Sequence, residues 1–138
     1  MQNYINYLKM SEFYISEKIY SEKQLRNYEV KLDFNFTSTY KRFMKEVGSG
    51  YFSGDYNVML PNGTSIQNFY PLKLIVELTR DFHKNEIPEE SIPFGADNTG
   101  NIYCFRKEVD GVFFVDHGFN SVDKISEDFQ SFLSLIKP

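Results

Sequence analysis

The chain has 138 residues, of which 41% are hydrophobic and 17% aromatic, and its 15 basic and 19 acidic residues give a net charge of −4. This length suits one hydrophobic core, so we expect residues 1–138 to form a single domain. The acidic balance disfavours direct binding to DNA or RNA, because phosphate contacts need an excess of Lys and Arg. The 14 phenylalanines and 10 tyrosines indicate a bulky core, and some tyrosines are candidates for a recognition surface.

The sequence carries no signal for a membrane or for export. No apolar run reaches the ~18 residues that a membrane-spanning helix needs, and the N-terminus lacks the basic and apolar regions of a signal peptide. The one cysteine, Cys104, cannot form an intramolecular disulfide. We therefore expect a cytoplasmic protein without cofactor or bound metal.

The first half of the chain predicts helices. Residues 1–20 suggest a short amphipathic helix from the irregularly spaced apolar residues Tyr4, Ile5, Leu8 and Phe13. Ser21 and Gln24 have the spacing of a capping box, which predicts a helix over 22–32. The apolar period then predicts a second helix over 38–47.

Strand patterns begin after residue 50. Short apolar runs at 51–52 and 58–60 are followed by the hairpin turn 61–64, PNGT, in which Asn-Gly takes positive φ angles readily. Residues 66–70 are the expected returning strand. Helical spacing resumes over 72–83.

The last third of the chain predicts further strands and one helix. Pro88 and Pro93 bracket an expected loop, and residues 92–95 are expected to pair only at their edges, because proline lacks the amide proton that a central strand donates. Strands are expected over 101–107 and 112–116, joined through 108–111. A final helix is expected to begin near Ser126 and to bury Phe129, Phe132, Leu133 and Ile136. This order predicts an α+β fold, a central antiparallel sheet with helices packed mainly on one face.

Five segments carry a family resemblance: 92–105 (IPFGADNTGNIYCF), 111–117 (GVFFVDH), 125–133 (ISEDFQSFL), and upstream YKRF at 40–43 and GSG at 48–50. They resemble segments of the SUKH superfamily, whose bacterial members are mostly immunity proteins against secreted toxins. The resemblance covers most of residues 21–136, and it implies an α+β domain that binds a cognate protein toxin. It also leaves open a regulatory or scaffolding protein-binding module of the same fold.

Few residues are candidates for catalysis or metal binding. Cys104 lies in an apolar strand, where burial makes a thiol a poor nucleophile. Asp116 and His117 are placed for turn hydrogen bonding, or alternatively for proton transfer in a small hydrolase. His83 is expected to interact with a helix C-terminus. Residues 97–101 lack the later glutamate of a calcium loop, so we expect no enzyme and no metal site.

Acidic residues gather in one stretch of the sequence. Residues 84–128 hold ten acidic and four basic residues, a net charge of −6. Such a surface can meet the basic cleft of a nuclease or another cytotoxic enzyme, although charged residues also serve simply to keep a face soluble. The predicted partner-binding residues are Glu86, Glu89, Glu90, Asp97, Asp110 and Asp116.

Overall fold

The computed structural model describes residues 13–15, 20–58, 65–81, 87–118 and 121–137. For residues 13–15, 53–58 and 137 this description covers the backbone alone. In chain order the elements are β1 (Phe13–Ile15), α2 (Glu22–Leu32), α3 (Ser38–Glu46), β2 (Gly50–Val58), β3 (Ser65–Phe69), α4 (Leu72–Arg80), β4 (Ser91–Ala96), β5 (Ile102–Arg106), β6 (Val109–Asp116), β7 (Ser121–Ser126), α5 (Phe129–Ser134) and β8 (Ile136–Lys137).

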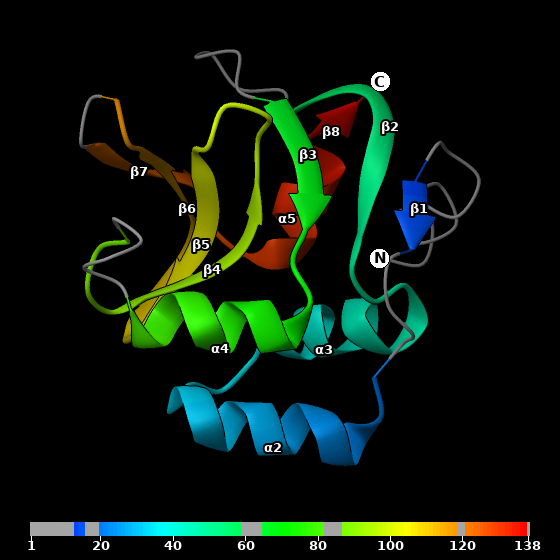
Figure 1. The fold of residues 1–138 in the computed structure, drawn as a ribbon, viewed down its shortest axis with the longest axis vertical. Coiled ribbons are helices and arrows are strands. Elements are labelled where there is room, and N and C mark those ends of the chain that lie inside the picture. Colours follow the sequence, from blue (N-terminus) through cyan, green and yellow to red (C-terminus); the bar gives the residue numbers. More distant parts are fainter. Residues whose placement is uncertain (1–12, 16–19, 59–64, 82–86, 119–120, 138) are drawn as a thin grey trace.

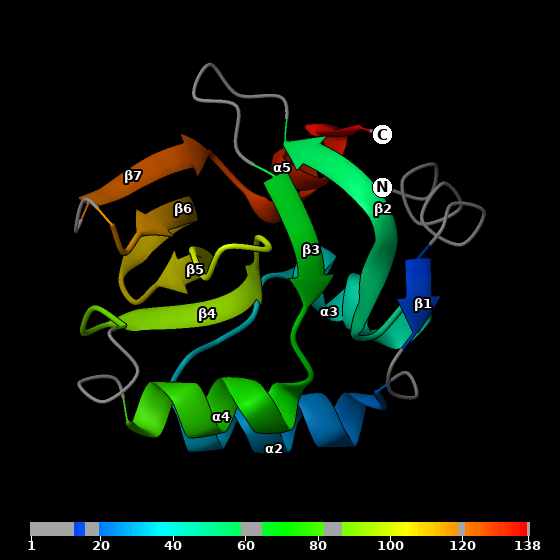
Figure 2. The same cartoon turned by 45° about the horizontal axis from the view of Figure 1, so that its top comes forward.

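The strands form one antiparallel sheet (Figure 1). Its order follows the chain from β1 to β7, and β8 pairs with β2 at residues 57–58, beyond the part of β2 that pairs with β1. In Figures 1 and 2, α2, α3 and α4 gather at one end of the strands, and α5 lies behind β3. The predicted α+β class, with an antiparallel sheet and helices mainly on one face, is confirmed.

Alternation along the strands separates two hydrophobic clusters. Tyr103 and Phe105 of β5 join the large core that contains residues from all four helices, whereas Cys104 between them joins Phe113 and Val115 in a small cluster. Since successive strand residues point to opposite faces, the large core lies on the helix side and the small one on the other.

The large core is built mainly from aromatic rings. The Phe94 ring lies 4.6 Å from the ring of Phe105 and 5.4 Å from each of the rings of Phe129 and Phe132, measured between centroids. Phe129, Phe132, Leu133 and Ile136 are all buried, as the sequence predicts. These contacts fix β4, β5 and α5 against one another.

The two helices α2 and α3 match their predicted positions. The Ser21 hydroxyl accepts a hydrogen bond from the Gln24 N–H, and the Gln24 side chain accepts one from the Ser21 N–H, so the capping box is confirmed. Helix α3 ends at Glu46, one residue before the predicted end.

Several predicted boundaries need correction. Phe13 lies in strand β1 and not in a helix, because residues 13–15 pair with 50–52 of β2; Tyr4, Ile5 and Leu8 lie outside the described residues. Strand β2 is continuous through 50–58, with a register shift against β3 between Tyr51 and Tyr56. The turn 61–64 lies outside the described residues. Helix α4 ends at Arg80, with Asp81 as its C-cap, and so stops before the predicted end at residue 83.

The loop predicted between Pro88 and Pro93 ends earlier, before Ser91, and the edge-only pairing predicted for residues 92–95 is wrong on the β5 side. Residues Ser91–Ala96 form β4, which lies inside the sheet between β3 and β5. The pairing of β4 with β3 is confined to Gly95 and Ala96, and a register shift separates Pro93 from Gly95 on the β5 side. The missing amide proton of Pro93 therefore leaves the short β3 pairing intact.

The connection after β5 is shorter than predicted. Pairing of Arg106 with Val109 leaves a two-residue turn in which Glu108 takes a φ of 64°. Gly111 has a φ of 120°, but it lies within β6, where a Cβ atom would come 2.8 Å from the Ser126 carbonyl oxygen. Glycine at this position therefore permits close pairing of β6 with β7, and it is not part of the turn between β5 and β6.

The start of the final helix also needs correction. Residues 121–126 form the edge strand β7, and α5 begins at Phe129, with Asp128 as its N-cap. The Asp128 carboxylate accepts a hydrogen bond from the Ser131 N–H at 2.7 Å. A short, polar edge strand lacks the apolar alternation by which strands are recognised.

Candidate functional site: an acidic groove

The predicted acidic residues separate into two groups. Glu89 and Glu90 precede β4 at the end where Ser91 pairs with Arg106, and Asp110 lies near the same end of β6. Asp97 and Asp116 lie at the opposite end of these strands, beyond the pairs Ala96–Ile102 and Ile102–Val115. Glu86 lies outside the described residues. The structure therefore does not bring the five described acids into one cluster.

The Asp97 carboxylate holds the turn that follows β4. Its Oδ1 accepts hydrogen bonds from the Thr99 N–H at 2.9 Å and the Asn101 N–H at 2.9 Å, and its Oδ2 accepts one from the Asn101 side chain. A carboxylate with this many local donors is already committed to the turn.

Asp116 and His117 also take part in turn hydrogen bonding, as one of the sequence interpretations predicts. The Asp116 Oδ1 accepts from the Gly118 N–H at 2.9 Å, and the His117 ring Nε2 lies 3.0 Å from the Thr99 carbonyl oxygen. The His117 N–H donates to the Asn101 side chain. His83 lies outside the described residues.

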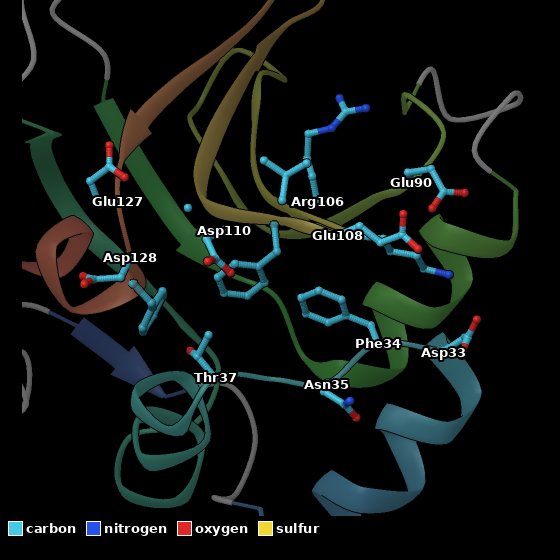
Figure 3. A pocket seen from close by; sticks show the side chains of 15 residues that line it. Asp33, Phe34, Asn35, Thr37, Glu90, Arg106, Glu108, Asp110, Glu127 and Asp128 are labelled. Carbon is cyan, nitrogen blue, oxygen red and sulfur yellow. The ribbon is translucent and has the colours of Figure 1, made fainter.

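A groove of about 810 Å³ lies at the other end, where Glu90 and Asp110 are found (Figure 3). The α2–α3 connection, the β5–β6 turn and the start of α5 form its walls. We call it the acidic groove, and its lining residues are Asp33, Phe34, Asn35, Thr37, Glu90, Phe105, Arg106, Lys107, Glu108, Val109, Asp110, Gly111, Glu127, Asp128 and Phe129.

Carboxylates outnumber cations in the acidic groove by six to two. The cations are Arg106 and Lys107, and the acids are Asp33, Glu90, Glu108, Asp110, Glu127 and Asp128. Glu127 pairs with Lys124 at 3.0 Å, and Asp128 caps α5. Among the described residues, the other four carboxylates form no ion pair, so their charge remains available to a partner.

Three of these acids occupy left-handed backbone positions. Asp33, Glu90 and Glu108 have φ angles of 50°, 65° and 64°, and among the described residues no other non-glycine residue has a positive φ. Asp33 ends α2, where its N–H donates to the Glu29 and Val30 carbonyls. The Glu90 carbonyl oxygen accepts from the Lys107 N–H at 2.8 Å, which joins two walls of the groove.

Aromatic rings form the floor of the acidic groove. The half-buried Phe34 ring stacks on Phe105, with centroids 5.8 Å apart and an interplanar angle of 20°. Phe105 in turn contacts Phe129 at 5.9 Å within the large core. The floor is thus continuous with the core, and it holds the carboxylates on a rigid support.

Sequence reasoning missed four members of the groove: Asp33, Glu108, Glu127 and Asp128. The last three fall inside the acidic stretch 84–128, so their charge was visible, but their convergence depends on the turn at Glu108 and the start of α5. Asp33 lies more than fifty positions upstream. The sequence does offer one clue to Asp33. The capping box marks the start of α2, and Asp33 lies at the end of that helix.

The described residues contain a poorly reactive thiol and no grouped metal ligands. Cys104 is fully buried, and this burial raises the pKa of its thiol to about 12, so the reactive thiolate is suppressed. Within the described ranges, no three His, Cys, Asp or Glu side chains are grouped to hold a metal ion. No helix in that part of the chain is long and apolar enough to cross a membrane.

Comparison with known proteins gives one family. The model of SUKH_6, described as SMI1-KNR4 cell-wall, matches residues 22–133. The match runs from the start of α2 into α5, and every residue of the acidic groove lies within it. No curated protein matches the chain.

Proposed function

The chain belongs to the SUKH superfamily, and on this premise we propose that it is an immunity protein that binds a cognate toxin in the cytoplasm and neutralises it by occlusion. The family is associated with immunity proteins. The observation that carries the proposal in this chain is the acidic groove, where four carboxylates that have no ion pair within the described ranges lie around an aromatic floor.

The charge of the groove favours a basic partner surface. A nuclease, or another cytotoxic enzyme with a basic active-site cleft, presents cations that normally contact phosphate or other acidic groups. Carboxylates held on fixed backbone can replace those acidic groups and cover the cleft. Complementary charge also raises the association rate, up to about 10⁸–10⁹ M⁻¹s⁻¹ at low salt. Occlusion of this kind requires no catalytic residue in the immunity protein.

The acids proposed from the sequence now fall into two classes. Glu89, Glu90 and Asp110 remain candidates for partner binding, because they lie at the end of the sheet that holds the groove. Asp97 and Asp116 hold turns at the other end, so we assign them no direct contact in this proposal. In their stead we include Glu108 and Asp33 among the proposed partner-binding residues.

Co-expression with the toxin encoded by the adjacent gene tests the proposed function. We expect the wild-type chain to restore growth and to co-purify with the toxin. A chain that neither protects cells nor co-purifies would contradict the proposal. In that case, a neighbouring gene unrelated to toxins would favour a regulatory or scaffolding module of the same fold.

A matched pair of double variants tests the role of the groove. Glu108→Gln with Asp110→Asn removes two groove charges, while Glu77→Gln with Asp123→Asn removes two exposed charges outside the lining. We expect only the groove variant to lower the association rate and its dependence on salt. Equal rates for the two variants would remove the groove from the interface while leaving toxin binding elsewhere on the chain.

A further inference from the structure

We propose that the acidic groove selects a partner segment that presents arginine rather than lysine. This inference rests on the proposed function and names the chemistry of the partner at that site. It starts from the aromatic floor, because carboxylates alone attract both cations.

The Phe34 ring is held so that it can receive a planar group. One side of the ring is covered by Phe105, stacked at 5.8 Å, and Phe36 contacts it at 5.9 Å with an interplanar angle of 72°. The residue is only half-buried, and it lines the groove. In Figure 3 it lies in the middle of the lining, with Glu108 and Asp110 to its two sides.

This arrangement fits the chemistry of a guanidinium group. Arginine is planar and weakly hydrated, so it stacks on an aromatic face, and its donors form a fork that bonds a carboxylate through two atoms. The lysine ammonium is a compact and strongly hydrated charge that gains less from a ring. A groove with carboxylates around a ring therefore discriminates between the two.

The Arg106 side chain of the groove does not cover the ring. The Arg106 guanidinium donates to the Glu89 carbonyl oxygen at 3.3 Å, and Figure 3 shows its side chain directed away from Phe34. The volume of about 810 Å³ exceeds that of one side chain. The occupant is thus a segment of a partner, with at least one arginine lying over Phe34.

A pair of peptides tests the preference on the intact chain. One is a capped peptide of three arginines separated by glycines, and the other has lysines in the same places. In an NMR titration at low salt, we expect the arginine peptide to bind several-fold more tightly and to shift the amide signals of residues 33–37 and 105–111. Equal affinities, shifts confined to other regions, or no binding by either peptide would each overturn the inference.

Variants separate the ring from the charges. Phe34→Leu should reduce the affinity for the arginine peptide to that for the lysine peptide, and Phe34→Tyr, which retains a ring, should preserve the difference. If Phe34→Leu does not fold, Glu108→Gln with Asp110→Asn gives the second test, since it should weaken arginine binding more than the control Glu77→Gln with Asp123→Asn does. Equal affinities of the groove variant and the control variant for the arginine peptide would contradict the proposal.

The two proposals fail in distinguishable ways. If the chain protects cells from the toxin but shows no preference between the peptides, the immunity function stands and the arginine inference fails. If the preference is present but no protection is observed, the groove binds arginine on a partner other than the toxin.

Discussion

The Tyr20 hydroxyl accepts a hydrogen bond from the Leu72 N–H at 3.0 Å, across 52 positions of the chain. Helix α4 begins at Leu72, and its N-cap, Pro71, supplies no side-chain hydrogen bond. Tyr20 thus acts as a remote cap. Its own N–H donates to the Met44 carbonyl oxygen at the end of α3, and its ring contacts Tyr28 of α2, so one residue ties three helices together.

We expect Tyr20→Phe to lower the free energy of unfolding by about 1–2 kcal/mol, because the buried Leu72 N–H loses its acceptor. Urea denaturation followed by circular dichroism measures the change. Tyr28→Phe is the matched control, and it should have a smaller effect. Equal stability of Tyr20→Phe and the wild type would show that the remote cap contributes nothing.

The backbone at Glu108 predicts a conflict between stability and binding. Its φ of 64° suits glycine better than a residue with a side chain. Glu108→Gly should therefore raise the free energy of unfolding by up to about 1 kcal/mol while weakening toxin binding. Asp110→Gly, in the adjoining strand, should reduce both. A Glu108→Gly variant that is less stable than the wild type would argue against stored strain at this turn.

At Gly111, by contrast, we expect the addition of a small side chain to lower the stability of the fold. A Cβ atom there would lie 2.8 Å from the Ser126 carbonyl oxygen, at a φ of 120°. We expect Gly111→Ala to cost about 1–3 kcal/mol of stability, because β6 and β7 must separate. Gly118→Ala, where the nearest atom is a side-chain oxygen at 3.3 Å, should cost less. Thermal melts of the two variants provide the comparison.

Burial of Cys104 predicts a loss of stability at alkaline pH. Its thiol pKa is raised to about 12 in the folded chain, so the folded state retains a proton that the unfolded state releases near pH 9. The stabilising contribution is complete below about pH 8.5 and falls as pH rises toward 12. Burial also raises the pKa of Tyr40 and Tyr70, which adds to the same trend.

The contribution of the thiol can be isolated with Cys104→Ala. This variant should be less stable near neutral pH because it leaves a cavity, but its stability should fall less steeply between pH 9 and 11. Urea midpoints at several pH values measure both slopes. Parallel slopes for the variant and the wild type would contradict the role given to the thiol.

Local signals predicted much of the fold. The capping box at Ser21 and the apolar period after it located α2, and the apolar residues of β5 and β6 located two neighbouring strands of the sheet. Strand β7 was missed because its sequence, SVDKIS, has the polarity of an edge strand. Pro93 misled the interpretation because its effect on pairing depends on how far β3 extends, which is a tertiary property.

The candidate site was harder to predict because it also depends on tertiary packing. Acidity of residues 84–128 pointed to the correct region, yet it included Asp97, whose carboxylate is used within its own turn. It also omitted Asp33, which reaches the groove because the α2–α3 connection packs on β5 through Phe34 and Phe105. Sequence separation gave no indication that Phe34 would stack on Phe105.

Strands β1 and β8 pair with the same strand, β2, although they lie near opposite ends of the chain. The groove involves β5 and β6, and β3 and β4 lie between these strands and β2. The chain leading to a tag at either terminus therefore leaves the described fold beside β2, away from β5 and β6. Immobilisation through either tag should present the same surface to a dissolved partner, so kinetics from the two orientations can be compared directly.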